Sequence, residues 1–243
     1  MSQPGYPIEN AFIKLLPPNL RAIEAACAWI GRDMGLPLPE AVFVRVNRAV
    51  IRKGVDWPFP SPEETCFGTL EVRLAQSVIK IDSAALRSLF AGWPHLLTAA
   101  VFDHLIANDD RSAANLLLDG QNSLWLIDHS RSLGGAGRSL FSDPFVLIRN
   151  IFLEMLKAKP LAERLKMQQP LLSACAAASV AVEKVPFEGL RIEERLASQI
   201  QRFLRARSRA LVAILQQELG IPDLFQSSSQ TGVVDGSQGY RLQ

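Results

Sequence analysis

The most informative part of the sequence is Asp103-His-Leu-Ile-Ala-Asn-Asp-Asp110-Arg-Ser-Ala-Ala-Asn115, followed by Leu126-Ile-Asp128-His129. An apolar helix is predicted over 95–107 and ends shortly before Asp110. Two apolar runs around an Asp-Gly turn then predict a β-hairpin. Because a hairpin brings the start of its first strand near the end of its second, we expect Asn115 and Asp128 to lie side by side. Asp110 would lie on the loop just before them.

Two carboxylates and one amide would then converge on one polar pocket. Oxygen ligands from separate strands suit Mg²⁺, which proteins usually hold with one or two carboxylates plus substrate phosphates. The carboxylate that is not needed as a ligand can orient a hydroxyl and accept its proton. Asp109 and Asp110 could also be ordinary loop-forming residues at a helix end. Their joint spacing to Asn115 and Asp128 favours a functional site.

This spacing is that of the protein-kinase catalytic loop and its metal-binding aspartate. The phrase F-D-x-L-I-x-N-x-D-R-x-x-x-N…W-L-I-D-H, over 102–129, resembles the short HipA-family kinases of bacteria. The N-x-D-R form is also similar to phosphatidylinositol kinases. Upstream, F-I-K at 12–14, R-A-x-E at 21–24 and G-L-P-x-P-E at 35–40 resemble the small lobe of the HipA family. The resemblance covers residues 11–157 with gaps.

The resemblance implies a role for each residue. Lys14 would contact the α- and β-phosphates of ATP, and Glu24 would pair with Lys14 and hold it in place. Asp110 would be the catalytic aspartate, while Asn115 and Asp128 would hold Mg²⁺. The implied function is an ATP- and Mg²⁺-dependent kinase that transfers the γ-phosphoryl group to a hydroxyl, with Ser or Thr of a protein as the favoured acceptor.

The implied fold is α+β, a two-lobed protein-kinase-like fold. It divides into a short mixed N-terminal lobe (1–72), a mainly helical C-terminal lobe with the hairpin (73–225) and a disordered tail (226–243). The strands predicted in the N-terminal lobe cover 11–16, 41–46 and 66–72. The predicted helices cover 20–34, 84–90, 95–107, 145–157, 161–167, 170–182 and 191–219. Asn19 is the expected N-cap of the first helix, and Asp82 can cap the second.

Composition narrows the remaining function classes. The chain has 243 residues, of which 48% are hydrophobic, and its formal net charge is +2. This balance argues against a polycationic nucleic-acid binder. Three widely spaced cysteines without a CxxC motif argue against a disulfide scaffold or a cysteine-rich zinc site. No signal-peptide pattern and no long apolar run occur, so we expect a cytoplasmic protein without a membrane span.

Structural roles are expected for several other polar residues, and for some of them a binding role is also open. Arg111 is expected to brace the catalytic loop, and His104 to lie in the core. His129 could touch a phosphate or make a structural hydrogen bond. The arginines of the helix predicted over 191–219 are expected to form a solvated face, with an RNA contact as the weaker alternative.

The sequence departs from the kinase pattern ahead of Lys14. It has no G-x-G-x-x-G there, and only Gly5 precedes the lysine. The phosphate-covering loop is therefore shortened, supplied by a partner chain, or lost together with the activity. The G-G-A-G-R segment at 134–138 follows Asp128 and would belong to the activation segment. A nucleotide-binding pseudokinase or interaction module thus stays open as the alternative.

Overall fold

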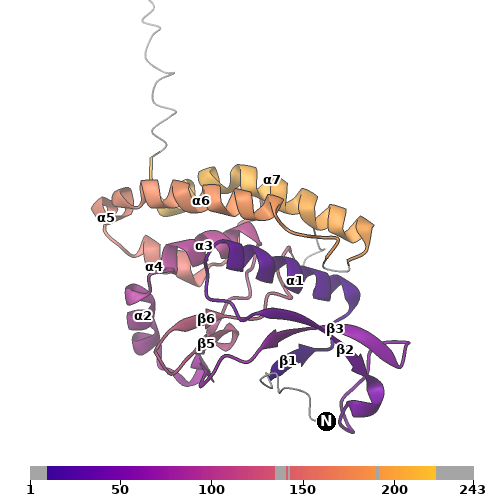
Figure 1. Cartoon of the computed structure of the whole chain (residues 1–243). Coiled ribbons are helices and arrows are strands. Elements are labelled where there is room, and N and C mark those ends of the chain that lie inside the picture. The colour runs from indigo at the N-terminus through magenta and orange to yellow at the C-terminus, as the bar shows by residue number, and fades with distance from the viewer. Residues whose placement is uncertain (1–9, 135–140, 142, 190–191, 223–243) are drawn as a thin grey trace, which may run out of the picture.

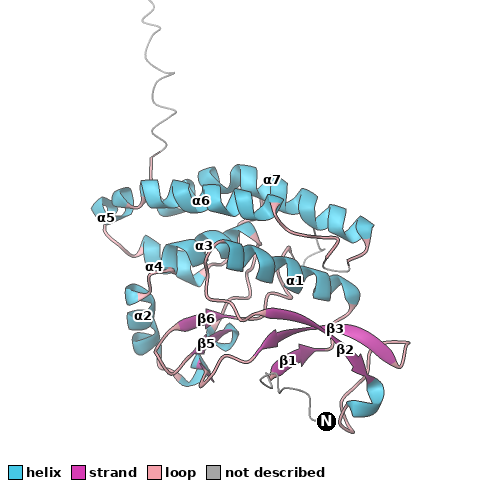
Figure 2. Cartoon of the chain, in the orientation of Figure 1, coloured by secondary structure: helices cyan, strands magenta, loops and turns pink. Residues whose placement is uncertain are grey.

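The computed structural model describes residues 10–134, 141, 143–189 and 192–222. In this part the chain is α+β, as the sequence predicts, with seven α-helices and two three-stranded antiparallel sheets. The long helices stack in layers above the two sheets (Figures 1 and 2). The predicted division into two lobes remains a prediction. The predicted tail at 226–243 and residues 135–138 of the glycine-rich segment lie outside the described residues.

The first sheet has the strand order β1-β3-β2 and the second has the order β4-β5-β6. Every neighbouring pair is antiparallel. The strands are β1 (Ala11–Lys14), β2 (Ala41–Asn47), β3 (Glu63–Leu70), β4 (Gln76–Ser77), β5 (Leu116–Leu118) and β6 (Leu124–Leu126). The hairpin predicted after the loop that carries Asp110 is therefore present as β5 and β6.

The helices occupy the regions predicted for them, with shifted ends. They are α1 (Pro18–Asp33), α2 (Ser83–Gly92), α3 (Leu96–Leu105), α4 (Ile151–Lys157), α5 (Leu161–Lys166), α6 (Gln168–Glu183) and α7 (Glu194–Leu219). Asp82 caps α2 by accepting hydrogen bonds from the backbone N–H groups of Ala84 and Ala85. None of the described helices is long and apolar enough to cross a membrane.

The predicted bounds of helix α1 and of strand β3 are wrong. Helix α1 begins at Pro18 and has Pro17, not Asn19, at its N-cap position. Proline at the first helical position loses no hydrogen bond and already has a helical φ, so it starts the helix earlier. Strand β3 covers Glu63–Leu70 rather than 66–72, because it pairs with β2 as far back as Glu63 opposite Asn47.

The predicted helix over 145–157 is also wrong in its first half, because α4 begins only at Ile151. The Asn150 side chain accepts hydrogen bonds from the N–H groups of Phe152 and Leu153, which caps the helix. The Asn150 amide also donates to the Ala100 carbonyl on α3 at 2.8 Å. This anchoring fixes the start of α4.

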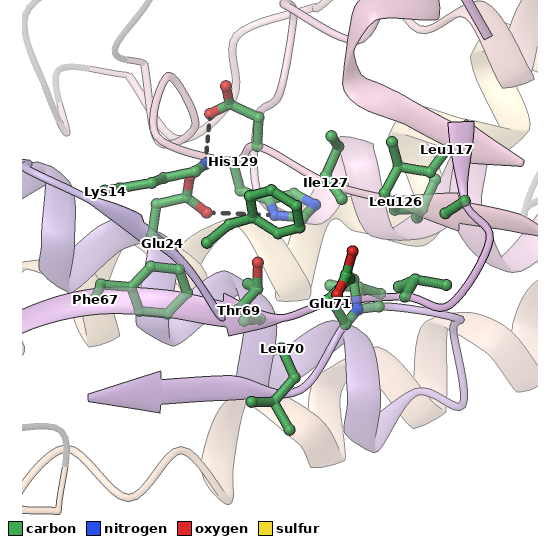
Figure 3. A pocket seen from close by; sticks show the side chains of 17 residues that line it. Lys14, Glu24, Phe67, Thr69, Leu70, Glu71, Leu117, Leu126, Ile127 and His129 are labelled. Carbon is green, nitrogen blue, oxygen red and sulfur yellow. Dashed lines mark hydrogen bonds and ion pairs between the residues drawn. The ribbon is translucent and has the colours of Figure 1, made fainter. Parts of the chain in front are cut away.

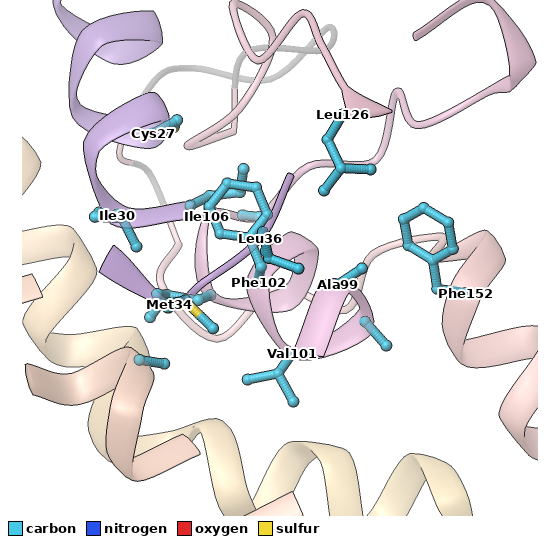
Figure 4. Packing of buried hydrophobic residues seen from close by; sticks show 14 of the residues in the cluster. Cys27, Ile30, Met34, Leu36, Ala99, Val101, Phe102, Ile106, Leu126 and Phe152 are labelled. Carbon is cyan, nitrogen blue, oxygen red and sulfur yellow. The ribbon is translucent and has the colours of Figure 1, made fainter. Parts of the chain in front are cut away.

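Buried side chains from α1, α3 and the hairpin meet in a continuous core with α4, α6 and α7 (Figure 4). His104 lies in this core, as predicted. Arg207 of α7 lies there too, which corrects the prediction that the α7 arginines form a solvated face. Its guanidinium donates to the His104 carbonyl and, at 2.8 and 2.9 Å, to those of Pro144 and Val146. Arg207 therefore joins α7 to α3 and to the segment before α4.

We expect burial of His104 to make stability depend on pH. Burial, aided by the charges of Arg207 and Lys157, lowers the pKa of His104 from 6.5 to about 3. The unfolded chain binds this proton below about pH 6.5 and the folded chain does not, so unfolding becomes easier as pH falls from 6.5 toward 3. Protonation of His104 should account for about 2 kcal/mol of the decrease in the free energy of unfolding between pH 7.5 and pH 5. In His104→Asn, where the asparagine can still accept a hydrogen bond from Asn150, this decrease should be smaller by that amount.

Urea unfolding of both proteins at the two pH values measures this difference. An equal loss of stability in the wild type and in His104→Asn would contradict the assignment.

Candidate functional site

A cavity of about 300 Å³ lies between the first sheet, helix α1 and the β5–β6 hairpin. Figure 3 shows Lys14, Glu24 and His129 gathered at one end of it, with Leu117, Leu126 and Ile127 along another side. The cavity thus has a charged end and a mainly apolar remainder. Its lining residues are Phe12, Lys14, Glu24, Ala28, Leu38, Pro39, Phe67, Thr69, Leu70, Glu71, Val72, Ala75, Leu117, Leu126, Ile127, Asp128 and His129.

Lys14 links two acidic residues at the charged end. It is the last residue of β1, while Glu24 is buried on α1. The Lys14 ammonium forms an ion pair with Oε1 of Glu24 and lies 3.1 Å from Oδ1 of Asp128. The pairing of Lys14 with Glu24 that the family resemblance implies is therefore present in the structure. Lys14 remains partly exposed, so its charge still faces the cavity.

His129 holds the other oxygen of Glu24. Its Nδ1 lies 3.6 Å from Oε2 of Glu24, and its ring packs edge-on against Phe102. Burial opposes ionisation of Glu24, but the interactions with His129 and Lys14 outweigh it and lower its pKa to about 2. Burial lowers the pKa of His129, although the neighbouring Glu24 carboxylate favours its protonated form. The structure shows a buried contact of His129 with Glu24, and because His129 also lines the cavity, the phosphate contact stays a prediction.

Asp110 lies on the loop that follows α3. The Asn115 amide donates to the Asp110 carbonyl at 2.9 Å and approaches its carboxylate at 3.4 Å. The Arg131 guanidinium donates to Oδ1 of Asp110 at 3.1 Å. The Asp110 side chain is still about one-third exposed, at 36%. Its carboxylate is therefore held in place but accessible from solvent.

A buried ion pair fixes this loop, which confirms the prediction that Arg111 braces it. Arg111 donates from Nε and Nη2 to the two oxygens of Asp103, at 3.0 and 2.8 Å, and both side chains are 0% exposed. Such a two-point contact fixes orientation as well as distance. Arg111 also donates from Nη1 to the carbonyls of Asn115 and Ile127. It thereby ties α3 to both strands at the open end of the hairpin.

The hairpin brings Asn115 and Asp128 to its open end. Leu116 pairs with Leu126, and the N–H of Ile127 donates to the Asn115 carbonyl at 3.1 Å. Asp128 follows in the left-handed region, with φ 57°. Aspartate enters that region more readily than most residues, and unusual backbone of this kind concentrates at functional sites. The Ser130 hydroxyl donates to Oδ1 of Asp128 at 2.9 Å.

Asn115 and Asp128 can supply oxygen ligands for a metal ion. The Asn115 amide nitrogen faces Asp110, so its oxygen is the atom that can ligate a cation. Among the described residues, no group of three or more His, Cys, Asp or Glu side chains is arranged to hold a metal. A cation at Asn115 and Asp128 would complete its coordination with phosphate oxygens and water, as Mg²⁺ commonly does.

Sequence reasoning assigned no role to Asp103 or Arg131. Asp103 could have been noticed as a carboxylate within an apolar helix, which normally requires a partner. Arg131 has no comparable signal, because its contact with Asp110 spans 21 residues of sequence. The apolar cavity wall was also missed, since it combines residues of both sheets and α1.

The chain is similar to known proteins in sequence and in fold. A family model described as HipA-like kinase matches residues 14–219. The crystal structure of a Helicobacter pylori proinflammatory kinase, CtkA, superposes with a TM-score of 0.52 and 10% sequence identity. The superposition covers 88% of this chain and 92% of that one, and at this identity the likeness concerns the fold. No curated protein gives a significant match.

Proposed function

Because the chain belongs to the HipA-like kinase family, we propose that it is an ATP- and Mg²⁺-dependent kinase that phosphorylates a hydroxyl. The observation that carries this proposal is the position of Lys14, whose ammonium contacts both Glu24 and Asp128 at one end of a mainly apolar cavity. A flat apolar base and a polyanionic phosphate chain require these two environments side by side.

The nucleotide would lie with its base in the apolar part of the cavity. Lys14 would bind the α- and β-phosphates, while Glu24, ionised in the fold, would keep the ammonium in place. Asn115 and Asp128 would hold Mg²⁺. When bound, that ion supplies charge neutralisation for the phosphates. The protein's main contributions would be position and electrostatics rather than covalent chemistry.

Asp110 would orient the acceptor hydroxyl and accept its proton. The hydroxyl oxygen attacks the γ-phosphorus, and the bond from that phosphorus to the β,γ-bridging oxygen breaks. The electron pair of that bond leaves with ADP. Asp110 is suited to this role because Asn115 and Arg131 hold it while its side chain remains accessible.

We propose Ser or Thr of a protein as the acceptor. An accessible carboxylate can meet a hydroxyl carried on another polypeptide, which a deeply enclosed one could not. A partner chain that completes the cover over the phosphates is part of the same hypothesis. We further expect the protein to act in the cytoplasm, without a nucleic-acid ligand.

Replacing Asp128 with alanine should abolish transfer of ³²P from [γ-³²P]ATP, because one of the two proposed metal ligands and a partner of Lys14 are lost. Incorporation into the chain itself and into a mixed protein substrate measures the reaction. Asp56→Ala removes an exposed carboxylate elsewhere and should transfer phosphate at the wild-type rate. Equal incorporation by wild type and Asp128→Ala would contradict the assignment.

The second candidate is a nucleotide-binding pseudokinase. It is favoured by the absence of a G-x-G-x-x-G motif before Lys14 in the sequence. In this case ATP would raise the melting temperature of the chain without being consumed. Phosphorylation of any substrate by the wild type, lost in Asp128→Ala, would exclude this candidate.

A further inference from the structure

Arg131 projects from a turn that is otherwise anchored in the core. The N–H of Ser132 donates to the His129 carbonyl at 3.0 Å, and the N–H of Leu133 donates to the Ile106 carbonyl at 2.7 Å. His129, Ser132 and Leu133 are all buried, whereas the Arg131 side chain is 63% exposed. The turn therefore holds the Arg131 backbone firmly and leaves the guanidinium at the surface of the site.

The Arg131 side chain turns back toward the proposed catalytic aspartate. Its Nη1 donates to Oδ1 of Asp110 at 3.1 Å, although Arg131 follows the proposed metal ligand Asp128 by only three residues. Arg131 thus connects the Asp128 side of the site with the Asp110 side. The transferred phosphoryl group would have to pass between these two sides.

Lys14 and Arg111, two further cations at the site, do not contact Asp110 among the described interactions. Lys14 lies between Glu24 and Asp128. Arg111 is 0% exposed and directs its donors to Asp103 and to two carbonyls. Of these three cations, Arg131 is the one that contacts Asp110, beside which the acceptor oxygen would lie.

We propose that Arg131 binds the γ-phosphoryl group of ATP and stabilises its charge during transfer, an inference that rests on the proposed kinase function. A guanidinium offers five N–H donors in a planar fork, and the contact with Asp110 uses Nη1. The remaining donors suit phosphate oxygens. As the acceptor oxygen bonds to the γ-phosphorus and the bridging oxygen leaves with ADP, the hydroxyl proton passes to Asp110. Arg131 keeps its own protons throughout.

The opposite role for Arg131 is equally testable. An arginine on Asp110 could instead occupy the position of the acceptor hydroxyl and restrain the enzyme. The two roles predict opposite changes in rate when the side chain is removed, which makes the full chain carrying Arg131→Ala the decisive variant. Arg131→Lys retains the charge without the fork. Arg205→Ala is the matched control, because Arg205 is also a half-exposed arginine paired with a carboxylate, Glu183, on the distant α6–α7 surface.

Two measurements are made on each protein with Mg²⁺ present. Calorimetry compares the affinity for ADP with that for the non-hydrolysable imido analogue of ATP. Steady-state transfer of ³²P gives kcat. For Arg131→Ala we expect the preference for the triphosphate to fall about tenfold with ADP affinity little changed, and kcat to fall on the order of 100-fold. Arg131→Lys should recover part of both losses, and Arg205→Ala should match the wild type.

The outcomes separate this inference from the proposed function. An unchanged triphosphate preference in Arg131→Ala, or a kcat that rises, would overturn the role of Arg131. If the wild type transfers no phosphate, the proposed kinase reaction is refuted. If Arg131→Ala nevertheless shows a weaker preference for the triphosphate than the wild type, the γ-phosphate contact is still supported. Equal melting temperatures of wild type and Arg131→Ala would show that the fold is intact.

Discussion

Replacing Asp110 with asparagine is expected to lower kcat for phosphoryl transfer on the order of 10³-fold, within the range contributed by a general base. Asparagine keeps the size of the side chain and can still accept the hydrogen bond from Arg131, but its amide cannot take the hydroxyl proton. Nucleotide affinity should change little, because Lys14, Arg131 and the proposed Mg²⁺ ligands Asn115 and Asp128 are all retained. The prediction is therefore tested by measuring kcat and the KM for ATP separately, and only kcat should change strongly.

Asp109 provides the matched control for this variant. It is the neighbouring aspartate on the same loop, and we assign it no contact with the acceptor. Asp109→Asn removes the same charge one residue away and should keep most of the activity. If Asp109→Asn and Asp110→Asn lost activity equally, the local charge rather than a base at Asp110 would be responsible.

Replacing Arg111 with leucine is expected to destabilise the fold by about 3–5 kcal/mol, because it leaves a buried carboxylate without its partner. Asp103 is 0% exposed and receives two hydrogen bonds from Arg111. The carbonyls of Asn115 and Ile127 would lose a donor as well. Urea unfolding at neutral pH measures the change, and a loss below about 1 kcal/mol would show that water or another donor replaces the arginine.

The double variant Asp103→Leu/Arg111→Leu separates stability from function. Removing both charges abolishes the buried unpaired carboxylate, so much of the stability should return. Phosphate transfer should stay low, because the hairpin ends no longer have the guanidinium that connects them to the loop. Full recovery of both stability and transfer in the double variant would show that Arg111 does not position Asn115 and Asp128.

The proposed site could be located from sequence because most of it is built locally. Asp110, Asn115 and Asp128 lie on one loop and one hairpin, where fixed spacing and a two-stranded turn leave few arrangements. The resemblance to a known family added Lys14 and Glu24, which the residues alone did not connect. The structure places Lys14 against both Glu24 and Asp128, a contact across more than 100 residues that no local pattern encodes.

The errors in the predicted fold have a common cause. Periodicity predicted a helix from 145, but the carbonyls of Pro144 and Val146 are held by Arg207 of α7, and Asn150 caps the helix at Ile151. Arg207 itself was predicted to be solvated because charged residues usually are. Both predictions used local preference, and contacts with distant elements overrode it.

The α+β class, the loop that carries Asp110 and the hairpin that joins Asn115 to Asp128 follow from periodicity, turn chemistry and short spacings, so they could be predicted from local sequence. The contacts of Arg111 with Asp103, of His129 with Glu24 and of Arg131 with Asp110 could be seen only in the folded chain. These contacts depend on how helices and sheets pack. The environment of a charged side chain, and hence what it can bind, is fixed by that packing.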